Sequence, residues 1–129
     1  RKIGAALDKV RNHFAVNRVA QAGALASLRD ESFVHSVVEQ VAEGRREYGE
    51  VASEIGVVAL PSATNFIALD VGTSERARAL VAGLLARGVF VRMPGVAPLD
   101  RCIRVTIGPA SERRFFVEVL RQEWRKVLL

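Results

Sequence analysis

The sequence predicts an α+β fold, in which a mixed sheet of about four strands is covered by helices and preceded by three further helices. Three observations support this prediction. Up to Ile55, apolar side chains recur every three or four positions, as they do on one face of a helix. From Val57 onward, the pattern changes to short apolar runs, and residues 102–107 alternate apolar and polar side chains, which is typical of strands. Glycine and proline separate these runs, so each element has a defined end.

Three helices are expected in the first half of the chain. The first covers residues 1–14, with apolar positions at Ile3, Leu7, Val10 and Phe14. It has no capping residue before it, which indicates a cut through a longer element. Asn17 can cap a second helix rich in small residues, and Asp30 can cap a third, long helix that Gly56 ends. The third helix has its apolar positions at Val34, Val37, Val41, Tyr48, Val51 and Ile55.

The second half of the chain is expected to follow the order β-β-α-β-β-α. The predicted strands span Val57–Leu60, Asn65–Asp70, Val89–Arg92 and Cys102–Ile107. We expect both faces of the second strand to be buried, because every residue from Phe66 to Leu69 is apolar. One helix follows Thr73 and ends at Gly88, and the last begins at Pro109. These helices are expected on one face of the sheet.

The composition is that of a globular domain. At 129 residues, half of them hydrophobic, the chain can form one domain with a core, and no apolar run reaches the length of a membrane span. The net charge is +5, but the basic residues are scattered, so we expect neither a nucleic-acid nor a membrane partner. The single cysteine, Cys102, lies in a predicted strand, where a buried, inert thiol is expected. The chain opens on Arg1 and its only methionine is Met93, so we expect it to be a piece of a longer protein.

The segment from Gly88 to Gly108 carries the clearest chemical signal. Arg92 closes one predicted strand, and Arg104 lies in the middle of the next, on the polar side of an apolar alternation. Two guanidiniums on neighbouring strands can bind a carboxylate or a phosphate, because each presents a planar fork of donors. The alternative is that both are ordinary solvated surface arginines.

Three segments carry a resemblance to a known family. They are KVRNHFAVNRVAQAGALASLRD at residues 9–30, LPSATNFIALD at residues 60–70, and GVFVR followed by IRVTIG between residues 88 and 108. Their sequence and order resemble the C-terminal small domain of the histidinol-phosphate aminotransferases, fold-type-I enzymes that depend on pyridoxal phosphate. Aromatic-amino-acid aminotransferases and a threonine-phosphate decarboxylase share much of the pattern. By this resemblance, residues 1–129 form a single C-terminal domain, and residues 1–30 belong to a helical region between domains.

The resemblance also implies what the domain does. Arg104 would bind the α-carboxylate of the substrate, and Arg92 would help to hold a distal anionic group such as a phosphate. Pyridoxal phosphate would be the cofactor of the complete enzyme, amino acids and 2-oxo acids its substrates, the cytoplasm its location and a homodimer its assembly. The lysines Lys2, Lys9 and Lys126 lie on predicted helix faces outside any cofactor-binding context. We therefore expect this chain to hold no cofactor and no catalytic residue, and to be inactive alone.

Other functional classes find little support in the sequence. The chain has no nucleotide-binding glycine motif and no nucleophile elbow. His13 and His35 lie too far apart for a metal site, and Glu43, Glu47 and Glu50 are expected to form a solvated helix face. One alternative stays open: a β-β-α-β-β-α unit with an anion clamp could be a regulatory or oligomerisation module that binds an amino acid without chemistry.

Overall fold

The computed structural model of the chain describes residues 2–11 and 16–128. The chain divides into two compact units, Arg1–Ser36 and Val37–Leu129. The first unit holds helix α1 (Lys2–Asp8) and helix α2 (Arg18–Arg29), and helix α3 (Glu31–Glu54) begins in it.

Both helix caps predicted in the first unit are confirmed. Asn17 Oδ1 accepts a hydrogen bond from the backbone N of Ala20 (2.8 Å), and Asp30 Oδ1 accepts one from the backbone N of Phe33 (3.1 Å). The first helix is shorter than the predicted span of residues 1–14, because it ends at Asp8. The predicted apolar position Phe14 lies outside the described residues.

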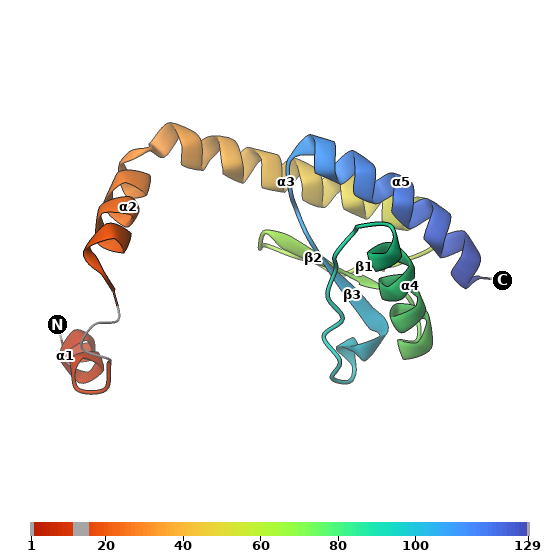
Figure 1. Ribbon diagram of the computed structural model, residues 1–129, viewed down its shortest axis with the longest axis horizontal. Coiled ribbons are helices and arrows are strands. Elements are labelled where there is room, and N and C mark those ends of the chain that lie inside the picture. The colour runs from red at the N-terminus through yellow and green to blue at the C-terminus, as the bar shows by residue number, and fades with distance from the viewer. Residues whose placement is uncertain (1, 12–15, 129) are drawn as a thin grey trace. The chain divides into compact units, whose positions relative to one another are not determined.

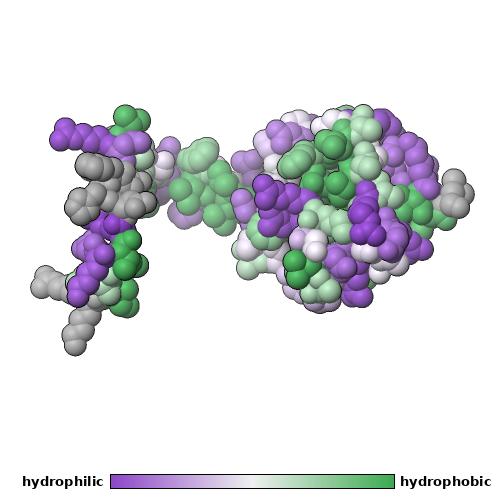
Figure 2. All heavy atoms as spheres, turned by 60° about the horizontal axis from the view of Figure 1, so that its bottom comes forward, coloured by the Kyte–Doolittle hydropathy of each residue, from purple (hydrophilic) through white to green (hydrophobic). Residues whose placement is uncertain are grey.

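Apolar side chains of the first unit are exposed. Ile3, Val10, Val19 and Leu28 are among the most exposed large hydrophobic residues of the chain, and α2 buries none of its residues. Figure 2 shows uncovered hydrophobic side chains of this kind in green. Because helices in proteins owe most of their stability to the packing of an apolar face, α2 lacks its main source of stabilisation here.

The second unit contains the sheet. After α3 come strand β1 (Val58–Ala59), strand β2 (Phe66–Asp70), helix α4 (Ser74–Ala86), the 3₁₀ helix η1 (Leu99–Arg101), strand β3 (Cys102–Thr106) and helix α5 (Ala110–Val127). The strands form an antiparallel sheet in the order β1-β2-β3. Ile67 lies opposite Val105, and Leu69 opposite Ile103, so these four buried side chains share one face.

Helices cover that buried face and complete the core. Figure 1 shows the second half of α3 and α5 running side by side over the sheet, and α4 packs against both α5 and β3. The indole nitrogen of Trp124 donates to the carbonyl of Ile55 (2.9 Å), and the ring of Tyr48 meets that of Phe116 edge-on, with centroids 5.1 Å apart. The predicted placement of helices on one face is therefore correct for this unit.

The predicted mixed sheet of about four strands is wrong in two respects. The sheet is purely antiparallel, and the predicted strand Val89–Arg92 does not form, since only Arg92 pairs with a strand residue. Its start is still tied to α4, because the backbone N of Val89 donates to the carbonyl of Leu84 (2.9 Å). Its continuation meets Pro94, which has no N–H to extend a ladder. In place of the expected strand, the structure therefore has a single β-bridge, between Arg92 and Arg104.

The expectation that both faces of the second strand are buried is also wrong. Ile67 and Leu69 are buried, but Phe66 and Ala68 on the other face are only partly covered. An antiparallel sheet can leave one face open in this way, whereas a parallel one rarely does. The open face is where Arg104 lies.

Candidate functional site

A single antiparallel bridge brings the two predicted site arginines together. The backbone N of Arg92 donates to the carbonyl of Arg104 (3.1 Å), and the backbone N of Arg104 donates to the carbonyl of Arg92 (2.6 Å). Residues directly opposite each other in an antiparallel pair project their side chains to the same face. Arg92 and Arg104 therefore stand side by side on the open face of the sheet.

Neither guanidinium of this pair is neutralised by a carboxylate of the described residues. The ion pairs there engage other arginines: Arg11, Arg46, Arg78, Arg87, Arg101, Arg113 and Arg121. Two like charges opposite each other repel, which costs stability unless an anion joins them. The pair is thus suited to binding an anionic ligand.

Local contacts fix the start of strand β3. Arg101 forms a salt bridge with Asp70 (2.7 Å), and its carbonyl accepts from the backbone N of Val71 (3.1 Å). Asp70 Oδ1 also accepts from the backbone N of Gly72 (3.0 Å). Beside them, Cys102 is almost fully buried, and burial raises the pKa of its thiol. The predicted buried cysteine is confirmed.

A buried arginine fixes the other end of β3. Arg113, which is 3% exposed, donates to the carbonyl of Gly108 (3.3 Å) just after the strand. It also pairs with Glu47 (2.7 Å) and Glu43 (3.1 Å) on α3. The hydrogen bond to Glu47, the largest cause, raises the pKa of Arg113 above its ordinary value. Gly44 makes room for this contact, since a Cβ there would lie 2.8 Å from Arg113 Cδ.

This cluster of Arg113 with two glutamates was not predicted from the sequence, and the expectation of a solvated glutamate face is corrected. Glu43 and Glu47 are not merely a solvated face, because both pair with a buried cation. A signal was available: Arg113 shares the helical stripe of Phe116 and Leu120, so its side chain had to turn inward. A charged residue on a buried stripe requires a partner.

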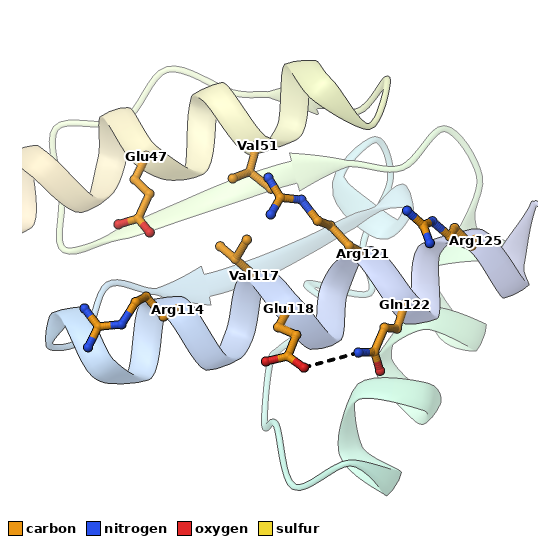
Figure 3. A pocket seen from close by; sticks show the side chains of 8 residues that line it. All are labelled: Glu47, Val51, Arg114, Val117, Glu118, Arg121, Gln122 and Arg125. Carbon is orange, nitrogen blue, oxygen red and sulfur yellow. Dashed lines mark hydrogen bonds between the residues drawn. The ribbon is translucent and has the colours of Figure 1, made fainter.

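A groove of about 520 Å³ lies elsewhere, between α3 and α5. Figure 3 shows its lining, with Val51 and Val117 between charged side chains, and Gln122 hydrogen-bonded to Glu118 (3.4 Å). This groove is on the helical side of the sheet, whereas Arg92 and Arg104 project from the other face. It is therefore separate from the candidate site.

Two further sequence expectations concern metals and membranes. Within residues 2–11 and 16–128, no group of three or more metal-ligating side chains comes together. His35 is exposed on α3, and His13 lies outside the described residues. None of the helices that the structure describes is long and apolar enough to cross a membrane.

Comparison with known proteins identifies the family of the chain. Residues 2–120 match the model of the family "Aminotransferase class I and II". The chain belongs to this family. The resemblance seen in the three sequence segments is thereby confirmed.

The aminotransferase relatives are much longer than this chain. It is 38% identical over 116 residues to the histidinol-phosphate aminotransferase of Akkermansia muciniphila, covering 90% of this chain and 31% of that protein. It is 37% identical over 115 residues to histidinol-phosphate aminotransferase 1 of Cupriavidus pinatubonensis, covering 88% and 31%. The crystal structure of histidinol-phosphate aminotransferase from Sinorhizobium meliloti in complex with pyridoxal-5'-phosphate is similar with a TM-score of 0.87 and 42% identity, over 95% of this chain and 34% of that one. The chain thus spans about a third of the length of these relatives.

The two lysines whose side chains the structure describes, Lys9 and Lys126, do not fit the Schiff-base site of pyridoxal phosphate. The cofactor needs a lysine for its Schiff base and a cradle for its phosphate. Lys9 is exposed just after α1, and Lys126 Nζ donates to Glu123 Oε1 (2.6 Å) near the end of α5. The side chain of Lys2 lies outside the described part. Both lysines are exposed to solvent, where neither is set up to form a Schiff base.

Proposed function

We propose that the chain is the C-terminal, substrate-recognising domain of a pyridoxal-phosphate-dependent aminotransferase of the histidinol-phosphate type. The complete enzyme would transfer an amino group from an amino acid to a 2-oxo acid. The observation that carries this proposal is the cross-strand pairing of Arg92 and Arg104 on the open sheet face. The histidinol-phosphate aminotransferases among the relatives favour the same reaction.

In this proposal the two arginines divide the recognition of the substrate. Arg104 binds the α-carboxylate of an amino acid, since it is partly buried and lies within a strand held at both ends. Arg92 is exposed and precedes a loop, so it helps to hold a distal anion such as a phosphate. The pairing gives the two side chains neighbouring positions on one face, from which both can reach one ligand with two charged groups.

The remaining parts of the proposal concern the complete enzyme. The cofactor lysine lies in a part of the enzyme outside these 129 residues, and residues 1–30 belong to a helical region between domains. The enzyme acts in the cytoplasm as a homodimer, and this domain closes over the substrate cleft. The exposed apolar side chains of α1 and α2 support contacts with such further parts of the protein.

An assay of the complete enzyme tests the proposed function. The purified enzyme with pyridoxal phosphate is offered histidinol phosphate, phenylalanine and aspartate as amino donors, each with a 2-oxo acid acceptor. We expect transamination, with histidinol phosphate among the donors used. Absence of transfer from every donor would overturn the proposal, and binding of an amino acid without transfer would favour the regulatory module instead.

A further inference from the structure

The guanidinium of Arg104 lies over the aromatic ring of Phe66. Its Cζ atom is 4.8 Å from the ring centroid, within the range of a cation–π contact. In the β2–β3 register, Phe66 lies opposite Thr106 and Arg104 opposite Ala68, so Phe66 and Arg104 are diagonal neighbours on the open face. Diagonal neighbours in a sheet are within reach when one is aromatic and the other is long.

The side chains around Arg104 favour a conformation in which its guanidinium points toward Phe66. Ala68, directly opposite on β2, is too small to hold a guanidinium. On the other side stands Arg92, whose like charge repels that of Arg104. The Phe66 ring, diagonal to Arg104 on β2, attracts the guanidinium, because the face of an aromatic ring carries negative charge density.

The backbone of Phe66 is held by the turn that precedes β2. The carbonyl of Phe66 accepts hydrogen bonds from Ser62 Oγ (2.6 Å) and Thr64 Oγ1 (3.2 Å). The carbonyl of Thr64 accepts in turn from Arg45 Nη1 on α3 (2.7 Å). The backbone that bears the ring is therefore held to the turn and to α3.

We propose that Phe66 is a positioning residue for Arg104, whose ring holds the guanidinium in place and leaves its N–H fork free for a carboxylate. A guanidinium stacked on a ring uses its flat face there, while its donors point outward in the guanidinium plane. Arg104 then reaches the substrate with less rotamer freedom to lose on binding. This inference rests on the proposed function, since it needs Arg104 to bind the substrate carboxylate.

Substitutions at Phe66 in the complete, cofactor-loaded enzyme test the inference. Phe66→Leu keeps an apolar side chain of similar size but has no ring, whereas Phe66→Tyr keeps the ring. The readouts are KM and kcat for the faster of the carboxylate donors phenylalanine and aspartate, together with the urea midpoint of unfolding. We expect Phe66→Leu to raise KM about three- to tenfold while kcat stays within about twofold of the unsubstituted enzyme. Phe66→Tyr, which keeps the ring, should have the same KM as the unsubstituted enzyme.

Two controls separate positioning from general structural damage. Phe115→Leu removes a half-exposed ring from helix α5, whereas the ring that lies against Arg104 belongs to β2, and it is expected to leave KM unchanged. In an Arg104→Lys background, Phe66→Leu is expected to add no further increase in KM, because the group that it positions is already gone.

The outcomes distinguish the two claims. If Arg104→Lys alone leaves KM unchanged, the carboxylate role of Arg104 in the proposed function fails. If Arg104→Lys raises KM but Phe66→Leu does not, only the positioning role of Phe66 is overturned. The positioning role would also be contradicted if Phe66→Leu lowered the urea midpoint so far that partial unfolding explained the higher KM. A KM of Phe66→Tyr as high as that of Phe66→Leu would contradict it as well.

Discussion

The main chains of Arg92 and Arg104 exchange two hydrogen bonds, and this one bridge places both arginine side chains on the open face of the sheet. Neither belongs to the ion pairs that the described residues form. Arg113, the buried arginine of the second unit, has two carboxylates close by, those of Glu43 and Glu47. This contrast supports the proposed role of the pair in binding an anionic ligand.

Substitution of Arg92 should distinguish phosphorylated from unphosphorylated donors. Arg92→Lys keeps the charge but loses the planar fork that matches a phosphate. We expect kcat/KM of the complete enzyme for histidinol phosphate to fall about tenfold, equivalent to about 1.4 kcal/mol. The value for phenylalanine, which has no phosphate, should change less. An equal loss for both donors would contradict the role of Arg92 in holding a distal anion.

Replacing the buried Arg113 should make the fold less stable. Arg113→Met keeps much of the apolar stem but removes the bonds to Glu43, Glu47 and the carbonyl of Gly108. We expect the free energy of unfolding to fall by about 1.5–3 kcal/mol in urea titrations, the range for charged hydrogen bonds. Arg114→Met, at an exposed neighbour on α5, is the matched control and should change it little. A loss as large in the control would show that the buried cluster is not the cause.

Tyr48 should make the protein less stable at high pH. Burial, with a smaller contribution from Glu47, raises the pKa of Tyr48 from 10.0 to about 12. Between these two values the unfolded chain loses the phenolic proton while the folded chain keeps it, so stability falls as pH rises, by about 2–3 kcal/mol at pH 12. Tyr48→Phe should lack this part of the pH dependence.

The ultraviolet absorbance of tyrosinate reports the same group directly, because Tyr48 is the only tyrosine of the chain. The folded chain should titrate near pH 12, and the urea-unfolded chain near pH 10. Titration of the folded chain at the ordinary value would mean that the ring is not buried as described.

The 129-residue chain should associate with itself at high concentration. The apolar side chains of α1 and α2 are exposed, and surfaces of this kind commonly drive association. Light scattering should show species larger than a monomer, and a dye that binds apolar surfaces should fluoresce. Replacing Val19 and Leu28 by serine should reduce both signals. A strictly monomeric chain with no dye binding would contradict the prediction.

Features that depend on neighbouring residues could be predicted from the sequence. The caps at Asn17 and Asp30 need only a side-chain oxygen and a helix that follows. The alternation around Arg104 placed Ile103 and Val105 in the core, and the structure agrees. Arg92 and Arg104 were expected on neighbouring strands, and the structure pairs them directly, although this is the only residue pair that forms there among the described residues.

Features that the pattern of apolar and polar residues does not encode could not be predicted. The loss of the strand at Val89–Arg92 follows from the bond between Val89 and Leu84 and from the path of the loop at Pro94. The stacking of Arg104 on Phe66 depends on the β2–β3 register, which no local pattern specifies. A shift of one residue would have moved Phe66 to the core face.

The measurement that tests the account most directly is the kinetics of Arg104→Lys in the complete enzyme. The variant keeps the charge but loses the fork that binds a carboxylate through two hydrogen bonds. We expect kcat/KM for amino-acid donors to fall by roughly 30- to 150-fold, which corresponds to about 2–3 kcal/mol. The fold should survive, because Ile103 and Val105 still fill the core. Unchanged kcat/KM for every amino-acid donor would contradict the carboxylate-binding role, and Arg104 would then be an ordinary surface arginine.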